Sequence, residues 1–365
     1  MKKLTLLLAA ACLAALMISC GNPSGRKANT GEPAAEPAEE IPAEPLHGPD
    51  SLNDAAAIFS GLAVDSTSAY FELTQNAVWR SHAKLIGERW APCKEGLDKV
   101  DAFARDTLAD LRARARTVLY TFSGPDLVYP AVLFPDADTI IMAALEPVGK
   151  VLLEKDLNKK TYLRSTPALS TLMKSSYFIT KSMKDDLGIE GLGGVTPVFE
   201  FFLSRLGYEI LSIGYGEPSL VEIKYFHPDE NREKVLRYYN VNLRNGGMPE
   251  AFKAMLSALD PGTTVGLFKS CSYCMHEDQY SEVRDYVLDH SFAIVQDDTG
   301  VRLKLLQDKG FDVKLYGKYT HPLAVFGEAV YQSDLTAAYK SSCAGEVDFR
   351  FGYNHTPAVM IARKK

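Results

Sequence analysis

Two stretches of the chain alternate short apolar runs with segments of helical periodicity, and this alternation limits the possible folds most. Residues 118–122 and 139–145 are apolar runs on either side of a short helical segment. Between residues 264 and 316, three more apolar runs alternate with two helical segments. Strands and helices in this order predict parallel strands joined by crossover helices. We therefore expect an α/β fold with a mixed, largely parallel, doubly wound (Rossmann-like) sheet.

Two further regions add to this sheet. Residues 220–226 and 235–243 are apolar runs on either side of a polar turn, which predicts an antiparallel hairpin at a sheet edge. In residues 51–116, apolar side chains recur at helical spacing, which predicts an N-terminal helical cover. We expect Pro92 to end one helix of this cover, and we expect residues 324–339 to be helical.

The amino terminus has the pattern of a secretory signal. Two lysines precede an apolar run over residues 4–18, and Ser19, Cys20 and Gly21 follow it. The run is shorter than the roughly 20 residues that a membrane-spanning helix needs. Leu16-Met17-Ile18-Ser19-Cys20 resembles the lipobox of bacterial lipoproteins. This resemblance implies a signal peptide over residues 1–19 and a lipid-modified Cys20.

The region after the lipobox differs from the rest of the chain. Residues 20–50 are rich in proline and glutamate, and Glu32-Pro33-Ala34 recurs as Glu36-Pro37-Ala38. Such a composition cannot bury a core and predicts an extended tether. A lipobox with such a tether is typical of Bacteroidota envelope lipoproteins. We expect anchorage to the outer membrane, in a leaflet that the sequence does not specify, with residues 117–365 as the α/β domain.

The charge of the chain limits its partners. The net charge is −6 and no basic cluster stands out, which argues against a nucleic-acid partner. The lipid anchor implies the membrane as one partner. An envelope glycan, peptide or protein is the other partner that we expect.

The first candidate site combines a turn with an acid. Ser123-Gly124-Pro125-Asp126 follows the first predicted strand, and Glu146 ends the second. This arrangement resembles the class I methyltransferases, in which the loop approaches the cofactor and the acid binds its ribose. The turn has a single glycine, and Pro125 removes a backbone donor. Because S-adenosylmethionine is a cytoplasmic cofactor and this domain is predicted to be exported, we expect at most a related fold and assign no cofactor.

The second candidate site is the acidic pair Asp297 and Asp298, which follows an apolar strand. Paired carboxylates at a strand end can bind a divalent metal or act as acid and base. The run Asp-Asp-Thr-Gly resembles the Asp-Asp-Gly of polysaccharide deacetylases, with Thr299 intervening and without a His-x-x-x-His. Helix capping is the structural alternative. We assign no metal, and we take Asp126, Glu146 and this pair as catalytic candidates.

The third candidate site is Cys271 and Cys274, between an apolar strand and a helix. Thioredoxin-like enzymes place their redox pair there, because a helix N-terminus stabilises a thiolate. With Cys93 and Cys343 these thiols could form disulfides in three ways, or could stay free. Zinc binding with a nearby histidine is a further alternative.

These observations support three functional hypotheses. The first is a non-catalytic binding or envelope-maintenance module, because no convergent catalytic motif is present. The second is an envelope hydrolase, acting on glycan or peptidoglycan, that uses strand-end carboxylates. The third is a thiol oxidoreductase that uses the cysteine pair.

Overall fold

The computed structural model describes residues 45–175, 193–217, 219–353 and 357–365. The predicted signal peptide, Cys20 and most of the predicted tether lie outside the described residues. Residues Pro45–Lys365 form one compact unit. Within the described part of the chain, no helix combines the length and the apolar character needed to cross a membrane.

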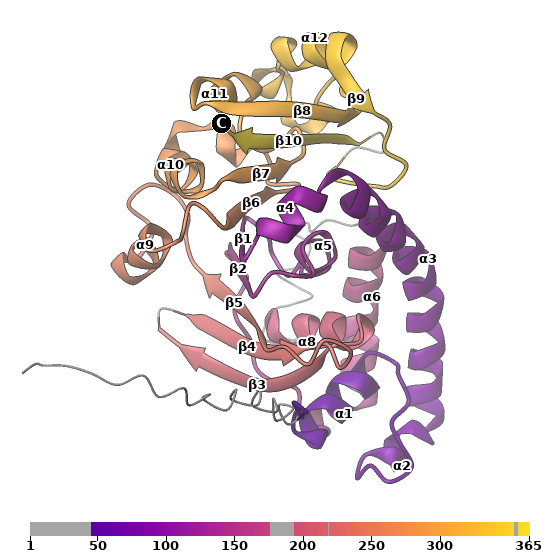
Figure 1. The fold of residues 1–365 in the computed structure, drawn as a ribbon. Helices are drawn as coiled ribbons and strands as arrows, with labels where there is room; N and C mark the ends of the chain where they lie inside the picture. Colours follow the sequence, from indigo (N-terminus) through magenta and orange to yellow (C-terminus); the bar gives the residue numbers. More distant parts are fainter. Residues whose placement is uncertain (1–44, 176–192, 218, 354–356) are drawn as a thin grey trace, which may run out of the picture. The chain divides into compact units, whose positions relative to one another are not determined.

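A ten-stranded sheet runs through this unit, with the strand order β3-β4-β5-β2-β1-β6-β7-β10-β8-β9 (Figure 1). The strands are β1 (Thr117–Thr121), β2 (Thr139–Ala144), β3 (Glu209–Gly216), β4 (Leu220–Phe226), β5 (Lys234–Asn240), β6 (Thr264–Phe268), β7 (Ala293–Gln296), β8 (Phe311–Gly317), β9 (Cys343–Gly345) and β10 (Ala358–Lys364).

The centre of the sheet is parallel and its flanks are antiparallel. The neighbours β5, β2, β1, β6 and β7 all run in the same direction. On one side β3 and β4 continue antiparallel from β5, and on the other side β10 runs antiparallel to both β7 and β8. This arrangement confirms the predicted mixed, largely parallel sheet with an antiparallel hairpin at its edge.

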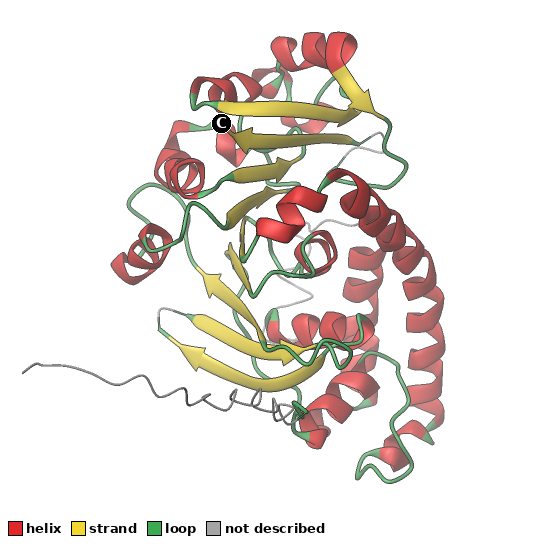
Figure 2. Cartoon of the chain, viewed as in Figure 1, coloured by secondary structure: helices red, strands yellow, loops and turns green. Residues whose placement is uncertain are grey.

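Helices cover both faces of the sheet (Figure 2). One core lies under the predicted N-terminal cover and three later helices, and the second lies under three helices from the carboxyl-terminal half. Successive β1 residues alternate between these cores, as a pleated strand requires: Val118 and Tyr120 belong to the first and Leu119 to the second. The first group is α1 (Asp50–Phe59), α2 (Phe71–Thr74), α3 (Ala77–Thr107), α4 (Ala109–Arg114), α5 (Val128–Leu133), α6 (Lys159–Ser175) and α8 (Thr196–Arg205); the second is α9 (Glu250–Ser257), α10 (Ser281–His290) and α11 (Leu303–Asp308), with α12 (Ser333–Ser342) over β8 and β10.

The prediction that Pro92 ends a helix is wrong. α3 continues through Pro92, which is exposed on the helix surface. A proline removes one backbone hydrogen bond from a helix. Trp90 before it and Leu97 after it are both buried in the same core, and this packing on both sides holds the helix together.

The predicted helix over residues 324–339 is also only partly correct. Residues 324–330 form two single 3₁₀ turns, η4 (Ala324–Phe326) and η5 (Glu328–Val330), and only α12 is a regular helix. Gly327 separates the two turns with a φ of 71°, a left-handed conformation that interrupts a right-handed helix.

Candidate ligand site

A cavity of about 760 Å³ lies at the carboxyl ends of four neighbouring parallel strands. Its walls come from the segments that follow β1, β2, β5 and β6. From β1 the chain continues to β2, which pairs with one side of β1, and β6 later pairs with the other side. The strand order therefore reverses between β1 and β6. Open α/β sheets bind ligands in the crevice at such a switch point. We name this space the carboxyl-end cavity.

The backbone at the cavity is held in an unfavourable conformation. Phe122, Ser270 and Ser272 line the cavity and have φ values of 58°, 55° and 53°. Tyr273, which follows them, has a φ of 58°. These are four of the six non-glycine residues with positive φ among the described residues, so this strain is concentrated at the ends of β1 and β6. Such clusters persist where the surrounding structure fixes them, and they are typical of ligand and active sites.

A buried ion pair forms part of the cavity wall. Lys269 follows β6, and its Nζ lies 2.8 Å from Oδ2 of Asp126, in the turn after β1. The Tyr120 hydroxyl donates to the same oxygen at 2.9 Å. The ammonium also lies 4.0 Å from the centre of the Tyr129 ring. The pair therefore joins the two strands on either side of the switch point.

The structure brings Glu146 to the same cavity as Asp126. Glu146 is buried just beyond the end of β2, and its carbonyl oxygen accepts hydrogen bonds from the Tyr238 hydroxyl at 2.7 Å and from Asn240 at 3.0 Å. These bonds fix the backbone that carries the carboxyl group. The turn and the acid on which the methyltransferase resemblance rests thus face one space.

Asp297 lies behind the cavity wall and does not line it. Its carboxylate accepts the backbone N–H of Ser270 at 2.8 Å, the backbone N–H of Thr299 at 2.9 Å and the Thr299 hydroxyl at 2.5 Å. Burial raises the pKa of Asp297, although these hydrogen bonds act to lower it. A Cβ at Gly352, whose φ is 83°, would lie 2.2 Å from Oδ2 of Asp297, so only glycine fits beside this carboxylate. Asp297 therefore positions the end of β6.

Asp298 is buried as well and accepts a hydrogen bond from the Tyr273 hydroxyl. Neither acid caps a helix, because α11 begins only after Arg302. The four predicted acids are therefore divided: Asp126 and Glu146 line the carboxyl-end cavity, whereas Asp297 and Asp298 support its wall from behind.

The cysteine pair also lies at this wall, and both thiols favour the protonated state. The Sγ of Cys271 is buried and donates to the Thr299 carbonyl at 2.8 Å. Burial raises the pKa of Cys271 well above its ordinary value and raises that of Cys274 to about 11. Redox cysteines have lowered pKa values. The structure has Cys93, Cys271, Cys274 and Cys343 as free thiols.

The mouth of the cavity is aromatic and apolar. Phe122 and Tyr280 are in edge-to-face contact, with ring centres 5.3 Å apart. Leu145 and Val325 are 62% and 83% exposed, and both line the cavity. Exposed apolar side chains around a polar interior are typical of a binding site.

Sequence reasoning missed three residues of this site: Lys269, Ser270 and Arg244. A lysine directly after the largely apolar strand β6 was a usable signal, because such a position faces the crevice of a parallel sheet. No sequence signal could reveal the positive φ of Ser270, because serine has no preference for that conformation. Arg244 reaches the cavity through a loop whose path depends on tertiary contacts.

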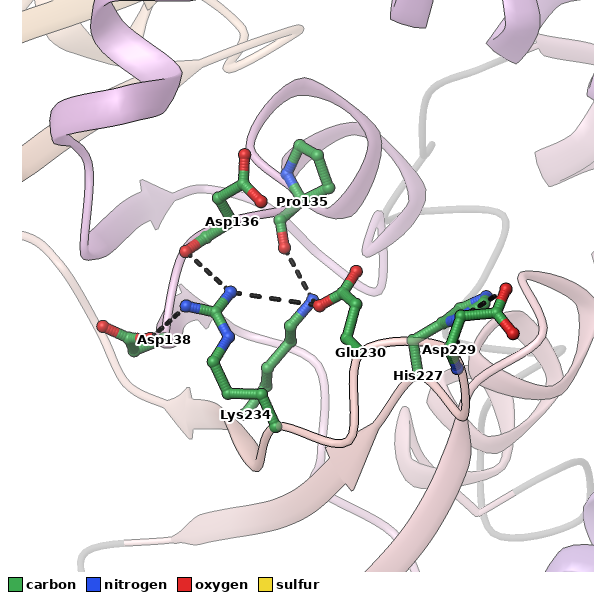
Figure 3. Close-up of polar contacts among 8 residues, drawn as sticks. Pro135, Asp136, Asp138, His227, Asp229, Glu230 and Lys234 are labelled. Atoms are coloured by element: carbon green, nitrogen blue, oxygen red, sulfur yellow. Dashed lines mark hydrogen bonds and ion pairs between the residues drawn. The ribbon is translucent and has the colours of Figure 1, made fainter. Parts of the chain in front are cut away.

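A second polar group of residues lies at the opposite ends of the same strands. We define this amino-end cluster as Asp138, Glu230, Arg232 and Lys234, and Figure 3 labels three of these residues, Asp138, Glu230 and Lys234. The buried Lys234 Nζ lies 2.5 Å from Glu230 Oε2 and donates to the Pro135 carbonyl at 2.7 Å. Arg232 binds Asp138 at 2.8 Å (Figure 3). These bonds tie the start of β5 to the start of β2.

Comparison with known proteins identifies no family for this chain, so any function has to be argued from the site. Among the described residues, no group of three or more His, Cys, Asp or Glu side chains is arranged to hold a metal ion. A scan against protein-family models matches none of them, and a search of curated proteins finds no similar sequence.

Proposed function

We propose that this protein is a lipid-anchored envelope module that binds a small molecule in the carboxyl-end cavity. One observation carries the proposal: strained backbone and buried polar side chains from the ends of β1, β2 and β6 converge on a single space of about 760 Å³. Ligand pockets have about this size, and they combine apolar walls with a few convergent polar groups. Binding alone accounts for these features.

The two enzymatic alternatives have less support. A hydrolase that uses Asp297 and Asp298 would need these carboxylates in the cavity, and they lie behind its wall. A thiol oxidoreductase needs an accessible thiolate, and burial favours the thiol form of both Cys271 and Cys274. The Asp126 carboxylate is occupied by Lys269 and Tyr120, which suits a wall residue.

A blocked mouth provides the test. Leu145→Trp places a large side chain at the cavity mouth, and Leu163→Trp changes a similarly exposed leucine (65%) that does not line the cavity. The purified full-length proteins are incubated with small molecules extracted from the cell envelope, and the retained compounds are identified by mass spectrometry. We expect wild type and Leu163→Trp to retain a compound that Leu145→Trp does not. Equal retention by all three proteins, or no retention by any, would refute the proposal, and turnover of a retained compound would replace it with an enzyme.

The membrane address is a separate part of the proposal, and it rests on the lipobox. Cys20→Ala should abolish labelling by a palmitate analogue and release the protein from the membrane fraction. A wild-type chain that carries no label, or a variant that stays with the membrane, would contradict the lipid anchor.

A further inference from the structure

The buried charged side chains of the carboxyl-end cavity have partners within the protein. Asp126 and Lys269 are bound to each other, and Tyr120 donates a further hydrogen bond to Asp126. Glu146 is buried and shares a side-chain hydrogen bond with Tyr238. These groups therefore serve the wall of the cavity, and the charge that a ligand meets first has to be sought elsewhere.

Arg244 is the remaining charged residue of the cavity wall, and it lies exposed at the mouth. Its Nε donates to the Tyr280 hydroxyl at 3.3 Å, and its guanidinium lies 6.0 Å from the centre of the same ring. Glu277 acts on Arg244 only through its charge, and no residue that the structure describes forms an ion pair with this guanidinium. Both Nη groups therefore remain for an anion, and a guanidinium can bind a carboxylate or a phosphate with two parallel hydrogen bonds.

The loop that carries Arg244 is fixed to the other side of the mouth by Asn245. The side-chain amide of Asn245 donates to the Asp278 carbonyl at 2.9 Å, and its side-chain oxygen accepts the Glu282 backbone N–H at 3.0 Å. These two bonds flank Tyr280 in the sequence, so they hold the arginine beside that ring. A ligand that binds the guanidinium therefore does not have to order this loop, and preorganisation of this kind increases affinity.

The cavity surface near this arginine is apolar. Tyr280 packs edge-to-face against Phe122, and Leu145 and Val325 also line the cavity. Both of these aliphatic side chains are largely exposed, and covering such side chains with an apolar ligand is favourable. A small inorganic anion would leave this surface in water, whereas an anion with an apolar body would cover it.

We infer that the ligand of the carboxyl-end cavity is an amphiphilic acid, a small molecule whose apolar or aromatic body lies in the cavity and whose carboxylate or phosphate group binds Arg244. This inference rests on the proposed binding function and gives its ligand a chemical class. It assigns the charge of the ligand to the mouth and leaves the buried charges to the wall.

Four probes test the two parts of this class. 2-Naphthylacetate and 2-naphthyl phosphate have the body and an anion, 2-naphthylacetamide has the body without the charge, and acetate has the charge without the body. Their affinities for the full-length protein are measured by ligand-observed NMR titration. We expect at least one naphthyl anion to bind about fivefold more tightly than the amide, since an ion pair at an exposed site contributes up to about 1 kcal/mol. The tighter of the two identifies the anion, and acetate should bind more weakly than either.

Two substitutions locate the anion. Arg244→Gln should reduce the affinity for the preferred naphthyl anion to that for the amide, and it should leave the affinity for the amide unchanged. Arg89→Gln changes an exposed arginine of α3 that does not line the cavity, and it should preserve the preference for the anion. Because salt screens exposed charges, this preference should decrease as the salt concentration rises. Circular dichroism spectra establish that both variants are folded.

The outcomes distinguish this inference from the proposed function. If the anions and the amide bind equally well, and Leu145→Trp abolishes their binding, the cavity is a binding site and the amphiphilic-acid class is wrong. A preference that survives Arg244→Gln, or acetate that binds as tightly as the naphthyl anions, would also refute the class.

The remaining outcomes refer back to the retention experiment. If no probe binds, or if Leu145→Trp changes nothing, the class is wrong, and retention of an envelope compound decides the binding function separately. A retained compound that is neutral would support the binding function and refute the class.

Discussion

The two ends of the parallel strands each bury a lysine, and the difference between them distinguishes the proposed binding site from a structural contact. At the carboxyl ends, the Lys269 side chain is 0% exposed and its partner Asp126 is 8% exposed. At the amino ends, the Lys234 side chain is 2% exposed, but its partner Glu230 is 36% exposed. Both ammonium groups also lie near a tyrosine ring.

The surroundings of the two lysines differ more than the lysines themselves. The amino-end cluster satisfies its charges with backbone carbonyls and arginine (Figure 3), and its Glu230, Arg232 and Asp138 side chains are 36%, 37% and 47% exposed. The Lys269 pair lines the cavity together with Phe122, Ser270 and Ser272, which have positive φ values. Burial of both charges and local backbone strain cost stability, and a fold keeps them where they serve another purpose. The comparison therefore supports the proposed binding role of the carboxyl ends.

The largest expected effect comes from breaking the Lys269 pair. Lys269→Met leaves the Asp126 carboxylate buried without its cation, and removing one partner of a buried pair costs about 3–5 kcal/mol. Urea unfolding monitored by fluorescence measures this change in the free energy of unfolding. A loss below about 1 kcal/mol would mean that water reaches Asp126 freely.

Asp297→Ala should have the next largest effect. It removes the acceptor of two backbone N–H groups and of the Thr299 hydroxyl, which we expect to cost about 2–3 kcal/mol. Because the Ser270 N–H is one of these donors, hydrogen exchange should accelerate at the end of β6 and not at the start of β5. Uniform acceleration over both regions would show that Asp297 has no local positioning role.

Lys234→Met should cost less than Lys269→Met, at about 1–2 kcal/mol. The Pro135 carbonyl loses its donor, but Glu230 is exposed enough to be hydrated after the ammonium is removed. The same urea titration gives the value, and ligand retention should be unchanged. Equal losses for the two lysines would break the distinction between the two ends.

The remaining effect appears only on acidification, as a pH dependence set by His276. Burial lowers the pKa of His276 from 6.5 to about 3, so the folded protein leaves this ring neutral where the unfolded chain binds a proton. The free energy of unfolding should therefore fall as the pH decreases from 6.5 to 3, and His276→Gln should remove a slope of about one proton from this window. Comparison with the variant separates this term from Asp297, whose raised pKa acts in the opposite direction. Superimposable pH profiles would contradict the neutral buried ring.

Sequence patterns predicted the fold better than the site. Alternating apolar runs and helical periods depend on local spacing, and they predicted the parallel centre and the antiparallel edge. Pro92 misled the prediction because long-range packing of Trp90 and Leu97 outweighs one missing hydrogen bond. The sequence prediction also missed the turns at residues 324–330. Their apolar residues face the cavity mouth and do not form a helix–sheet contact.

At the site, sequence position predicted which segments meet but not the role of each acid. Asp126 and Glu146 follow adjacent strands, and the rule for parallel sheets brings them together. Asp297 and Asp298 also follow a strand, yet their side chains turn toward backbone donors and Tyr273. That choice depends on the conformation of the loop after β6, which no local sequence signal specifies.

One measurement tests most directly whether the buried pair serves binding rather than folding. The double variant Asp126→Leu/Lys269→Met replaces both charges with apolar groups, and such replacements are often neutral or stabilising. We expect its free energy of unfolding to lie within about 1 kcal/mol of the wild-type value, while ligand retention is lost. A double variant as unstable as Lys269→Met, or one that is stable and still retains the ligand, would contradict this account.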